Sequence, residues 1–174
     1  LGRTLPEPLS PGGREWSGSA RLDGDRVTLF FTAAGERGEA PPSYRQRIFA
    51  AECRFSGDVE APFGQWKAPR EIVAADGVWY RPADEAGGRP GAIKAFRDPA
   101  YFHDEDGAEY LLFTGSSAQR PSAHDGVIGL ARRDAGGAYA LLPPLLEACG
   151  VNNELERAHI VRHGGLLYLF WSTQ

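Results

Sequence analysis

The sequence predicts an all-β protein built from short antiparallel strands. Its 22 glycines and 13 prolines in 174 residues interrupt the chain too often for long helices. Short apolar segments alternate with turns rich in Gly, Asp and Pro, as expected for strands joined by tight connections. One pattern also occurs three times: a polar motif, a short strand, a glycine turn and an apolar strand ending in Ser or Thr. These observations favour repeated antiparallel units within one domain over residues 1–174.

Composition narrows the classes of partner. A hydrophobic content of 42% and an aromatic content of 11% are typical of a globular protein. The net charge of -4 provides no basic surface, so we expect no nucleic-acid partner. No apolar run reaches the roughly 18 residues of a membrane helix, so we expect no membrane partner. Cys53 and Cys149 are compatible with a disulfide or with two buried thiols.

The first copy of the pattern lies near the N-terminus. Residues 1–14 are rich in Pro and Gly and are expected to form an extended loop. Residues 15–20 carry the polar motif Glu-Trp-Ser-Gly-Ser-Ala, and residues 21–26 form a turn. Residues 27–32 are the apolar strand that ends in Thr. This copy therefore begins the predicted sheet.

The segment after the first copy has the composition of strands and loops. Residues 44–55 alternate well enough for a strand, and residues 71–80 are expected to hold short strands around an Asp-Gly turn. Polar loops are expected at 35–43, 56–67 and 83–91. The first unit is thus predicted to contain about four strands, as small repeated sheets do.

The second copy has the same order of features. Residues 96–102, Phe-Arg-Asp-Pro-Ala-Tyr-Phe, precede a turn at 103–107 and an apolar strand at 110–114. A hairpin is then predicted from residues 127–132 and 138–142, because Asp-Ala-Gly-Gly separates them. The second unit therefore also has four strands.

The third copy ends the chain. Residues 156–161 form its short strand, residues 162–165 its Gly-Gly turn and residues 166–172 its apolar strand. Repeated antiparallel units of this size predict part of a β-propeller, with roughly two to three blades in this chain. The inner strand of each blade lines a central channel, so we expect the polar motifs at 15–17, 97–99 and 154–157 to converge.

The third motif places two carboxyl groups close together. In an extended backbone, side chains alternate between faces, so Glu154 and Glu156 are expected on one face and Leu155 and Arg157 on the other. Two carboxylates on one face repel each other, which favours keeping one of them protonated. A protonated carboxyl at neutral pH is what a general acid requires.

The three motifs together resemble glycoside hydrolase family 68. They read Glu-Trp-Ser-Gly-Ser-Ala at 15–20, Phe-Arg-Asp-Pro at 96–99 and Glu-Leu-Glu-Arg at 154–157, in this order. The family comprises levansucrases, inulosucrases and related β-fructofuranosidases, which are five-bladed propellers. Arg-Asp-Pro also occurs in the related invertase family 32, whereas Glu-Leu-Glu-Arg stands in place of that family's Glu-Cys. The resemblance implies a levansucrase-type fructosyltransferase that takes sucrose and sugar acceptors and needs no cofactor.

The resemblance implies two catalytic residues. Glu156 would be the general acid/base, protonating the glucosyl oxygen of sucrose and later activating the acceptor. Asp98 would hold hydroxyls of the fructosyl ring and stabilise the oxocarbenium-like transition state. This arrangement suits a retaining mechanism. The alternative for Asp98 is a turn carboxylate before Pro99.

The resemblance also implies substrate-binding residues. Arg97, Glu154 and Arg157 would position the sugar and adjust the acid, Trp16 would provide an apolar wall, and Ser17 would bond to the nucleophile. The structural alternatives are core packing for Trp16 and an ordinary ion pair for Arg97 or Arg157.

Three further positions bear on specificity and metal binding. Gln174 stands where many relatives carry Arg or His near the glucosyl and acceptor subsite, so it is also expected to bind substrate. Asn153 stands where calcium-binding relatives often carry Asp, and a neutral amide is a poorer calcium ligand than a carboxylate. We therefore expect no metal. The four histidines show no zinc-ligand spacing and are expected in turns or on the surface.

The chain departs from the family in one important respect. The family nucleophile is an Asp in a Trp-Asp motif, but the four tryptophans here are followed by Ser, Lys, Tyr and Ser. We therefore expect an internal piece of a larger enzyme, with the N-terminal nucleophile blade and the C-terminal blades outside this chain. Alone it would not form the covalent intermediate. The substrate class implies secretion, to the extracellular space or the periplasm.

Three alternatives to a fructosyltransferase remain. A sucrose-hydrolysing β-fructofuranosidase shares the first half-reaction, so the motifs do not separate it from a transferase. An arabinan-type hydrolase on the same propeller would need no Trp-Asp nucleophile upstream, but Glu-Leu-Glu-Arg disfavours it. A non-catalytic sugar-binding propeller would lack the upstream Trp-Asp altogether.

Overall fold

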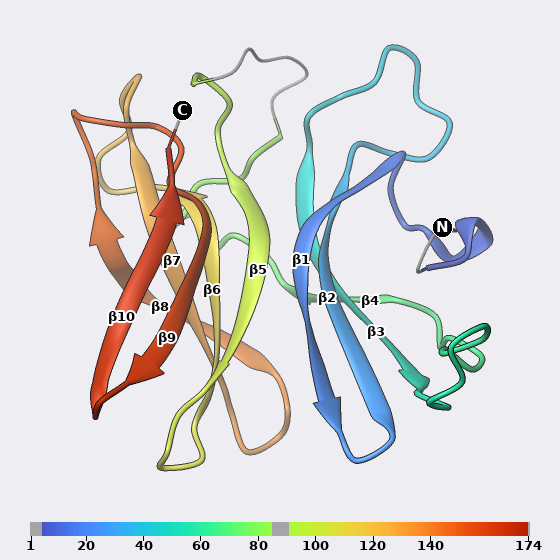
Figure 1. The fold of residues 1–174 in the computed structure, drawn as a ribbon. Helices are drawn as coiled ribbons and strands as arrows, with labels where there is room; N and C mark the ends of the chain where they lie inside the picture. Colours follow the sequence, from blue (N-terminus) through green and yellow to red (C-terminus); the bar gives the residue numbers. More distant parts are fainter. Residues whose placement is uncertain (1–4, 85–90, 174) are drawn as a thin grey trace.

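The computed structural model describes residues 5–84 and 91–173. Within these residues the chain forms ten strands and one short 3-10 helix, η1, at Glu7–Leu9. Hydrogen bonds arrange the strands in two sheets of four and one of two, and every pairing is antiparallel (Figure 1). The predicted all-β class and the repeated four-stranded unit are therefore confirmed.

The first four-stranded sheet, or first blade, follows the order of the sequence. Its strands are β1 Arg14–Asp23, β2 Arg26–Ala34, β3 Gln46–Arg54 and β4 Arg70–Val73. β1 extends three residues beyond the predicted segment 15–20, into what was expected to be a turn. The turn itself is confined to Gly24 and Asp25, because Asp23 still pairs with Arg26.

The second blade repeats this order. Its strands are β5 Phe96–His103, β6 Glu109–Ser116, β7 Gly126–Arg133 and β8 Tyr139–Glu147. β8 is longer than predicted and contains Pro143 and Pro144. Proline lacks an N–H for the ladder, and the outer edge of a sheet tolerates this loss.

The third sheet is a hairpin of β9 Glu156–His163 and β10 Leu166–Ser172. β1, β5 and β9, the first strands of the three sheets along the chain, are neighbours, with β5 between β1 and β9 in Figure 1. These are the inner strands that the repeat predicts, and each carries one of the three polar motifs.

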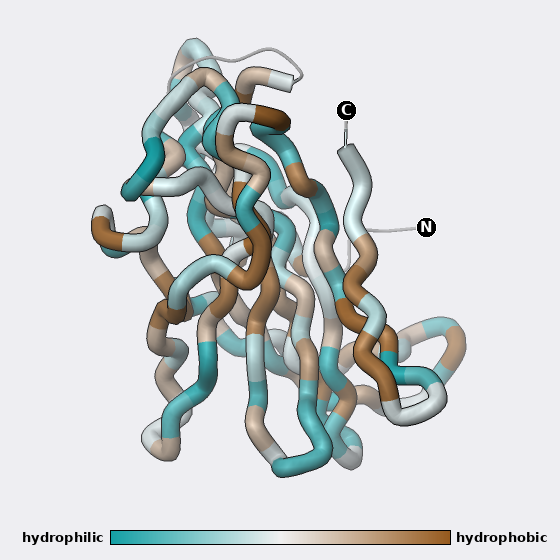
Figure 2. Tube along the Cα trace, turned by 90° about the vertical axis from the view of Figure 1, so that its left-hand side faces the viewer, coloured by the Kyte–Doolittle hydropathy of each residue, from teal (hydrophilic) through white to brown (hydrophobic). Residues whose placement is uncertain are grey.

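The core consists of layers between the sheets. Neighbouring residues of a strand point to opposite faces, so Phe30 packs toward the second blade while Phe31 packs on the outer side of the first. In the same way Leu111 belongs to the layer between the blades, and Leu112 packs toward β9. Apolar residues run along the strands in Figure 2, and several connecting turns are hydrophilic. The second blade therefore has an apolar layer on each of its two faces, one toward the first blade and one toward β9.

The two cysteines do not form a disulfide. Cys53 is buried and Cys149 is partly buried, and both are free thiols. Of the two possibilities for the cysteines, the structure therefore has the unbridged one. No helix in the described part of the chain is long and apolar enough to cross a bilayer.

Candidate functional site

Each inner strand is irregular at its polar motif. The register of β1 with β2 shifts between Trp16 and Gly18, and that of β5 with β6 shifts between Arg97 and Ala100. The register of β10 with β9 shifts between Phe170 and Ser172, opposite the third motif. β-Bulges re-aim side chains locally and are common beside active sites. The three motifs therefore share one backbone feature, a shift of strand register at the motif.

The register also shows which residues are equivalent. Trp16, Arg97 and Glu156 are each the last residue paired before the irregularity. Their partners are Thr32, Thr114 and Ser172, the Ser or Thr at which the apolar segment of each sequence copy ends. β2 and β6 each continue two residues further, to Ala34 and Ser116. The three copies of the sequence pattern therefore occupy equivalent positions in their sheets.

The residues after these positions have unusual backbone angles. Asp98 has φ 59° and Arg157 has φ 54°, the only positive values among the described residues that are not glycine. Side chains with a Cβ rarely adopt this left-handed region, and the strain costs on the order of 1–3 kcal/mol each. The surrounding structure must therefore enforce both conformations.

The left-handed turn at Arg157 corrects one prediction. Alternation placed Arg157 on the face opposite Glu154 and Glu156, but its side chain lines the same pocket as they do. The positive φ at Arg157 breaks the two-residue period, so the side chain turns back toward the carboxylates. Leu155 does point the other way, as predicted, into the apolar layer beneath β9.

Gly18 allows the first bulge to form. A Cβ on this residue would lie 1.8 Å from the carbonyl oxygen of Phe30 on β2. Only a residue without a side chain permits this close approach of two backbones. The glycine of Glu-Trp-Ser-Gly is therefore explained by packing at the bulge.

Arg97 connects the two acids of the third motif. Its Nη2 lies 3.1 Å from Oε1 of Glu154 and 3.0 Å from Oε1 of Glu156. The guanidinium and the Glu154 carboxylate are almost completely buried, while Glu156 is partly open to the pocket. The expected repulsion between the two carboxylates is thus offset by a positive charge between them.

Gln46 holds Arg97 from the other side. Its Oε1 accepts hydrogen bonds from Nη1 of Arg97 at 3.3 Å and from the backbone N–H of Phe96 at 3.1 Å. Its Nε2 donates to the carbonyl of Lys94 at 2.8 Å. Sequence reasoning missed Gln46 because one amide at the start of a predicted strand carries no signal of its own.

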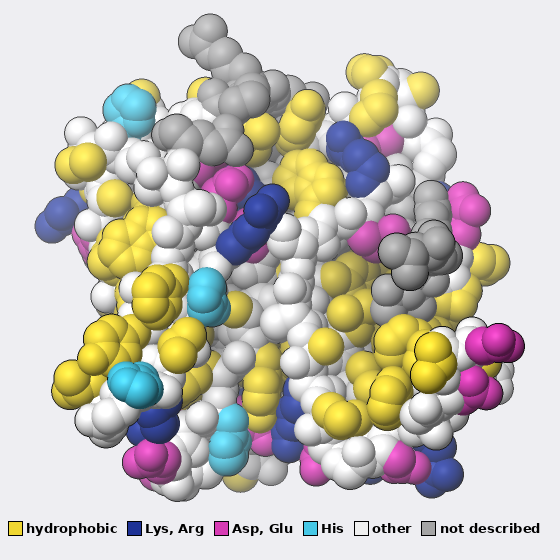
Figure 3. All heavy atoms as spheres, in the orientation of Figure 1, with side chains coloured by type: hydrophobic (Ala, Val, Ile, Leu, Met, Phe, Trp, Pro, Cys, Tyr) yellow, Lys and Arg dark blue, Asp and Glu magenta, His cyan; other side chains and the backbone are white. Residues whose placement is uncertain are grey.

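The motif residues gather around one pocket of about 220 Å³. All seven predicted site residues in the described part of the chain line it: Trp16, Ser17, Arg97, Asp98, Glu154, Glu156 and Arg157. Tyr44 and Ile93 complete the wall, and sequence reasoning missed both. Charged side chains of both signs meet in the upper part of the seam between the two halves of the molecule (Figure 3). Gln174, the eighth predicted residue, lies outside the described residues.

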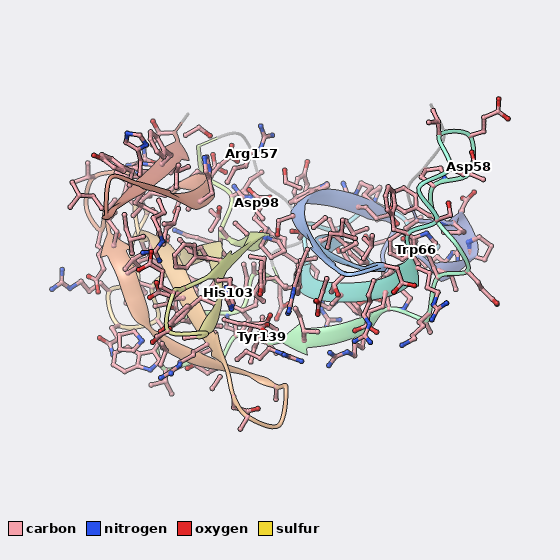
Figure 4. All side chains as sticks on the ribbon, turned by 60° about the horizontal axis from the view of Figure 1, so that its bottom comes forward. Asp58, Trp66, Asp98, His103, Tyr139 and Arg157 are labelled. Carbon is pink, nitrogen blue, oxygen red and sulfur yellow. The ribbon has the colours of Figure 1, made fainter. Side chains whose placement is uncertain are left out.

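A second hollow continues the site along the channel. It has a volume of about 480 Å³ and lies between β1, β5 and β9. Asp98 and Arg157 line both hollows, and His159 borders the second. In Figure 4 Asp98 and Arg157 lie side by side at the inner strands, far from Asp58 and Trp66 at the outer end of the first blade.

Asp98 is the site residue with the clearest electrostatic perturbation. Burial raises the pKa of its carboxyl, and the nearby Glu156 raises it further. Arg97, Arg157 and a backbone hydrogen bond from Arg157 oppose this rise in pKa without cancelling it. A buried carboxyl with a perturbed pKa in a cleft is a frequent feature of functional sites.

Aromatic and polar contacts shape the first wall of the pocket. The rings of Trp16 and Tyr44 lie 6.2 Å apart, and the guanidinium of Arg14 lies over both rings. Ser17 Oγ accepts a hydrogen bond of 3.2 Å from Nε of Arg157. Trp16 is partly buried and faces the pocket, so it does not serve only as core packing.

The buried ammonium of Lys94 holds the segment that leads into the third motif. Nζ of Lys94 donates to Oδ1 of Asp125 at 2.7 Å and to Oδ1 of Asn153 at 3.0 Å. It also donates to the carbonyls of Ser122 and Ala123. Asn153 is thus held by a cation of the chain itself, directly before Glu154. In the described residues no three His, Cys, Asp or Glu side chains form a cluster that could hold a metal ion.

The four histidines lie where the sequence indicated. His103, His124, His159 and His163 are all exposed. His159 stacks on Phe170 of the neighbouring strand, and its Nδ1 lies 3.1 Å from the carbonyl oxygen of Arg157. It borders the channel, although its spacing gave no reason to include it in the site.

Comparison with known proteins agrees with the motifs. The model of the levansucrase/invertase family matches residues 1–126 and 120–174, which together cover the whole chain. The chain belongs to glycoside hydrolase family 68. The predicted family is thereby confirmed.

Relatives of the chain include levansucrases of several bacteria. It is 31% identical to the levansucrase of Rahnella aquatilis and 29% identical to that of Erwinia amylovora. Each match covers 97% of this chain and 45% of the relative. The chain therefore spans less than half the length of these relatives.

Solved structures of the family have the same fold. An inulosucrase from Halalkalicoccus jeotgali bound to kestose is 33% identical, with a TM-score of 0.83, and the match covers 95% of this chain and 44% of that chain. A mutant levansucrase of B. megaterium is 23% identical, with a TM-score of 0.75 over 97% of this chain and 46% of that chain, which shows the fold alone. The chain is part of a five-bladed β-propeller, as predicted.

Proposed function

We propose that this chain forms the acid/base part of a fructosyltransferase active site that takes sucrose and passes the fructosyl group to a sugar acceptor. The observation that carries the proposal is the convergence of three motifs, from β1, β5 and the start of β9, on one pocket. Membership of family 68 supplies the substrate class. An inulosucrase relative binds kestose, which supports a sugar ligand for the pocket.

Glu156 is the proton donor in this proposal. Its carboxyl is partly open to the pocket, whereas the carboxyl of Glu154 is closed off. A proton donor must reach the leaving oxygen, so the accessible acid of the pair is the better assignment. Glu154 instead accepts bonds from Arg97 and from the N–H of Gly91 at 2.8 Å, which suits a residue that fixes the guanidinium.

Asp98 stabilises the transition state in this proposal. Cleavage of a fructosyl bond develops positive charge on the sugar ring, and a carboxylate facing the ring stabilises that charge. The left-handed backbone at Asp98 directs its side chain into the pocket. Arg97 and Arg157 flank this carboxylate and would hold it and the sugar hydroxyls in place.

Trp16 and Ser17 form the wall that meets the sugar and the nucleophile. The partly buried Trp16 offers an apolar face, as sugar rings require. Ser17 Oγ already accepts a hydrogen bond from Arg157, so its own hydrogen is left to donate to an attacking carboxylate. That carboxylate is the Asp of a Trp-Asp motif, which these 174 residues do not contain.

The test is to incubate the full-length protein that contains this chain with sucrose and to quantify free glucose and free fructose. A transferase releases glucose well in excess of fructose, because fructosyl groups remain on the acceptors. Equal amounts of the two sugars would favour the β-fructofuranosidase alternative. Release of neither sugar would contradict the proposal and favour a sugar-binding propeller.

The same proposal implies a location. Because sucrose is usually met outside the cytoplasm, we propose that the protein acts in the extracellular space or the periplasm. Fractionation of the producing cells, followed by detection of the protein, tests this directly. Recovery from the cytoplasmic fraction alone would contradict it.

A further inference from the structure

We propose that Thr32 is a positioning residue that holds Asp98 in its reactive conformation from the neighbouring blade. The inference rests on the proposed function, because it concerns how Asp98 is presented to the sugar. Thr32 ends the apolar segment 27–32 of the first copy, lies within β2 and pairs with Trp16 on β1. It is fully buried.

The Thr32 hydroxyl both accepts and donates a hydrogen bond. Oγ1 accepts a hydrogen bond of 2.8 Å from the backbone N–H of Asp98 and donates one of 3.2 Å to the carbonyl of Ser17. A hydroxyl has one hydrogen to donate and lone pairs to accept, so both bonds form together. One side chain thus connects the bulge of β1 with the bulge of β5.

The hydrogen bond from the Asp98 N–H to Thr32 takes the place of a bond within the sheet, which Asp98 lacks. The register of β5 on β6 skips from Arg97 to Ala100, so Asp98 has no partner in the ladder. Its N–H is buried, and a buried N–H without an acceptor costs about 1–3 kcal/mol. Thr32 Oγ1 is the acceptor, and it therefore stabilises the left-handed conformation that directs the carboxyl into the pocket.

The second copy of the pattern also has a threonine hydroxyl that reaches the next motif, although this hydroxyl donates to a carbonyl and does not accept from an N–H. Thr114 pairs with Arg97, as Thr32 pairs with Trp16. Its Oγ1 donates a hydrogen bond of 2.9 Å to the carbonyl of Leu155, the residue before Glu156, and it lies 3.5 Å from Oδ2 of Asp98. In both copies the hydroxyl at the end of the apolar segment reaches the motif of the next sheet. These contacts give the Thr of the first two copies a role in connecting neighbouring motifs.

The consequence for the reaction follows from geometry. Asp98 acts on charge that develops only in the transition state, so a small displacement of its carboxyl affects turnover more than ground-state binding. A displacement of about 1 Å near the chemistry costs on the order of 100-fold in rate. Loss of the Thr32 hydroxyl is therefore expected to lower kcat with little change in KM.

The experiment compares variants of the full-length protein that differ in one group. Thr32→Ser and Thr32→Ala both remove the methyl group, but only the Ser variant keeps the hydroxyl. Thr32→Val keeps the shape and removes the hydroxyl. Thr28→Val, on the same strand four residues earlier, is the control. We expect the Ala and Val variants to lose about 10- to 100-fold in kcat on sucrose with KM within about twofold, and the Ser variant and the control to stay near wild type.

A second readout does not depend on activity. Hydrogen exchange at the amide of Asp98 reports the bond to Thr32 directly. We expect faster exchange in the Ala and Val variants than in the Ser variant and the control. Unchanged exchange, or a kcat in the Ala and Val variants equal to that of the Ser variant, would overturn the inference. A wild-type protein that releases no sugar from sucrose would instead contradict the proposed function, and the exchange measurement would still decide the role of Thr32.

Discussion

The burial of Asp98 opposes the ionisation of its carboxyl. The proposed function requires an ionised Asp98 in the pocket, yet burial raises the pKa of this carboxyl because the ionised form loses its hydration. The left-handed backbone at the same residue adds conformational strain. We therefore expect Asp98 to lower the stability of the fold, as residues placed for function often do.

Replacing Asp98 by Asn is expected to separate activity from stability. The pKa of Asp98 is higher in the folded than in the unfolded state, so the stability linked to its protonation is fully present below the unfolded pKa of about 3.9 and is lost as pH rises through the folded pKa. At neutral pH, D98N should therefore unfold at higher denaturant concentration than wild type, with the difference vanishing near pH 4. Its turnover of sucrose should fall at least about 100-fold.

Urea titrations of both proteins across this pH range provide the measurement. The exposed Asp58, far from the pocket in Figure 4, gives the control variant D58N, which should match wild type in turnover. A D98N protein less stable than wild type at pH 7 would show that the ion pairs of Asp98 outweigh its burial.

Single residues of the site were predictable only where motifs named them. Trp16, Asp98 and Glu156 stand in short motifs, and the fold brings them to one pocket. The direction of Arg157 was predicted wrongly, because alternation assumes a regular strand and the left-handed turn is not visible in the residue types. Gln46 was missed, since a contact between residues far apart in sequence leaves no local pattern.

At the scale of elements, residues 152–155, directly before β9, do not belong to a strand. Contacts with Gly126 and Lys94 hold this segment in place. Backbone N–H of Gly126 donates to the carbonyl of Asn152 at 3.0 Å, and a Cβ on Gly126 would lie 2.7 Å from the Asn153 backbone. Lys94 contributes the cation that binds the Asn153 side chain. This segment leads directly into Glu154, so its packing determines where the third motif lies.

Replacing Lys94 by Met is expected to destabilise this segment. Asp125 would remain fully buried, and among the described residues the more exposed Arg81 would be its remaining charged partner. Breaking a buried ion pair costs about 3–5 kcal/mol. The control is Lys67→Met, whose pair with Glu52 is exposed and contributes less than about 1 kcal/mol. Denaturant unfolding of the two variants of the full-length protein measures the difference. Equal effects of the two substitutions would contradict the role given to Lys94.

The order of the strands was easier to predict than their ends. Tight turns mark the boundaries at 103–109 and 133–139, where Asp104 and Asp134 make the same backbone bonds to the residues three and four positions ahead. β1 and β8 run past their predicted ends because pairing with a neighbour extends a strand beyond its apolar part. Such pairing depends on the partner strand and is not encoded locally.

At the scale of the whole molecule, the third sheet exposes apolar surface. Leu166, Leu167, Tyr168, Phe170 and Trp171 of β10 are each at least 42% exposed. Hydrophobic side chains cover the β9–β10 hairpin on the left of Figure 3. Within the described residues β10 pairs only with β9, so one of its edges is open.

The 174-residue chain expressed by itself is therefore expected to self-associate. Open strand edges with apolar side chains promote intermolecular pairing. The double substitution L167K/Y168K should reduce association, whereas L22K, at a different exposed apolar residue, should not. Size-exclusion chromatography with light scattering measures the masses. A monodisperse wild-type species of 18.9 kDa would contradict this expectation.

The propeller was predictable from the threefold recurrence of one pattern, whereas the number of blades was not. Three sheets fix the repeat but not how many repeats close the ring, and only the family resemblance implied five. The convergence of motifs on a channel follows from the repeat itself. The chemistry at that convergence depends above all on which carboxyl supplies the proton.

The most direct test of that chemistry is to compare E156Q and wild type of the full-length protein on sucrose and on a nitrophenyl β-fructofuranoside. Glucose needs a proton to leave, while nitrophenolate leaves without one. We predict that E156Q loses about 10²- to 10⁴-fold in turnover of sucrose but retains the first release of nitrophenolate within about tenfold. The exposed Glu60 provides the control E60Q. Equal losses on both substrates, or undiminished turnover of sucrose, would contradict the assignment of Glu156 as the proton donor.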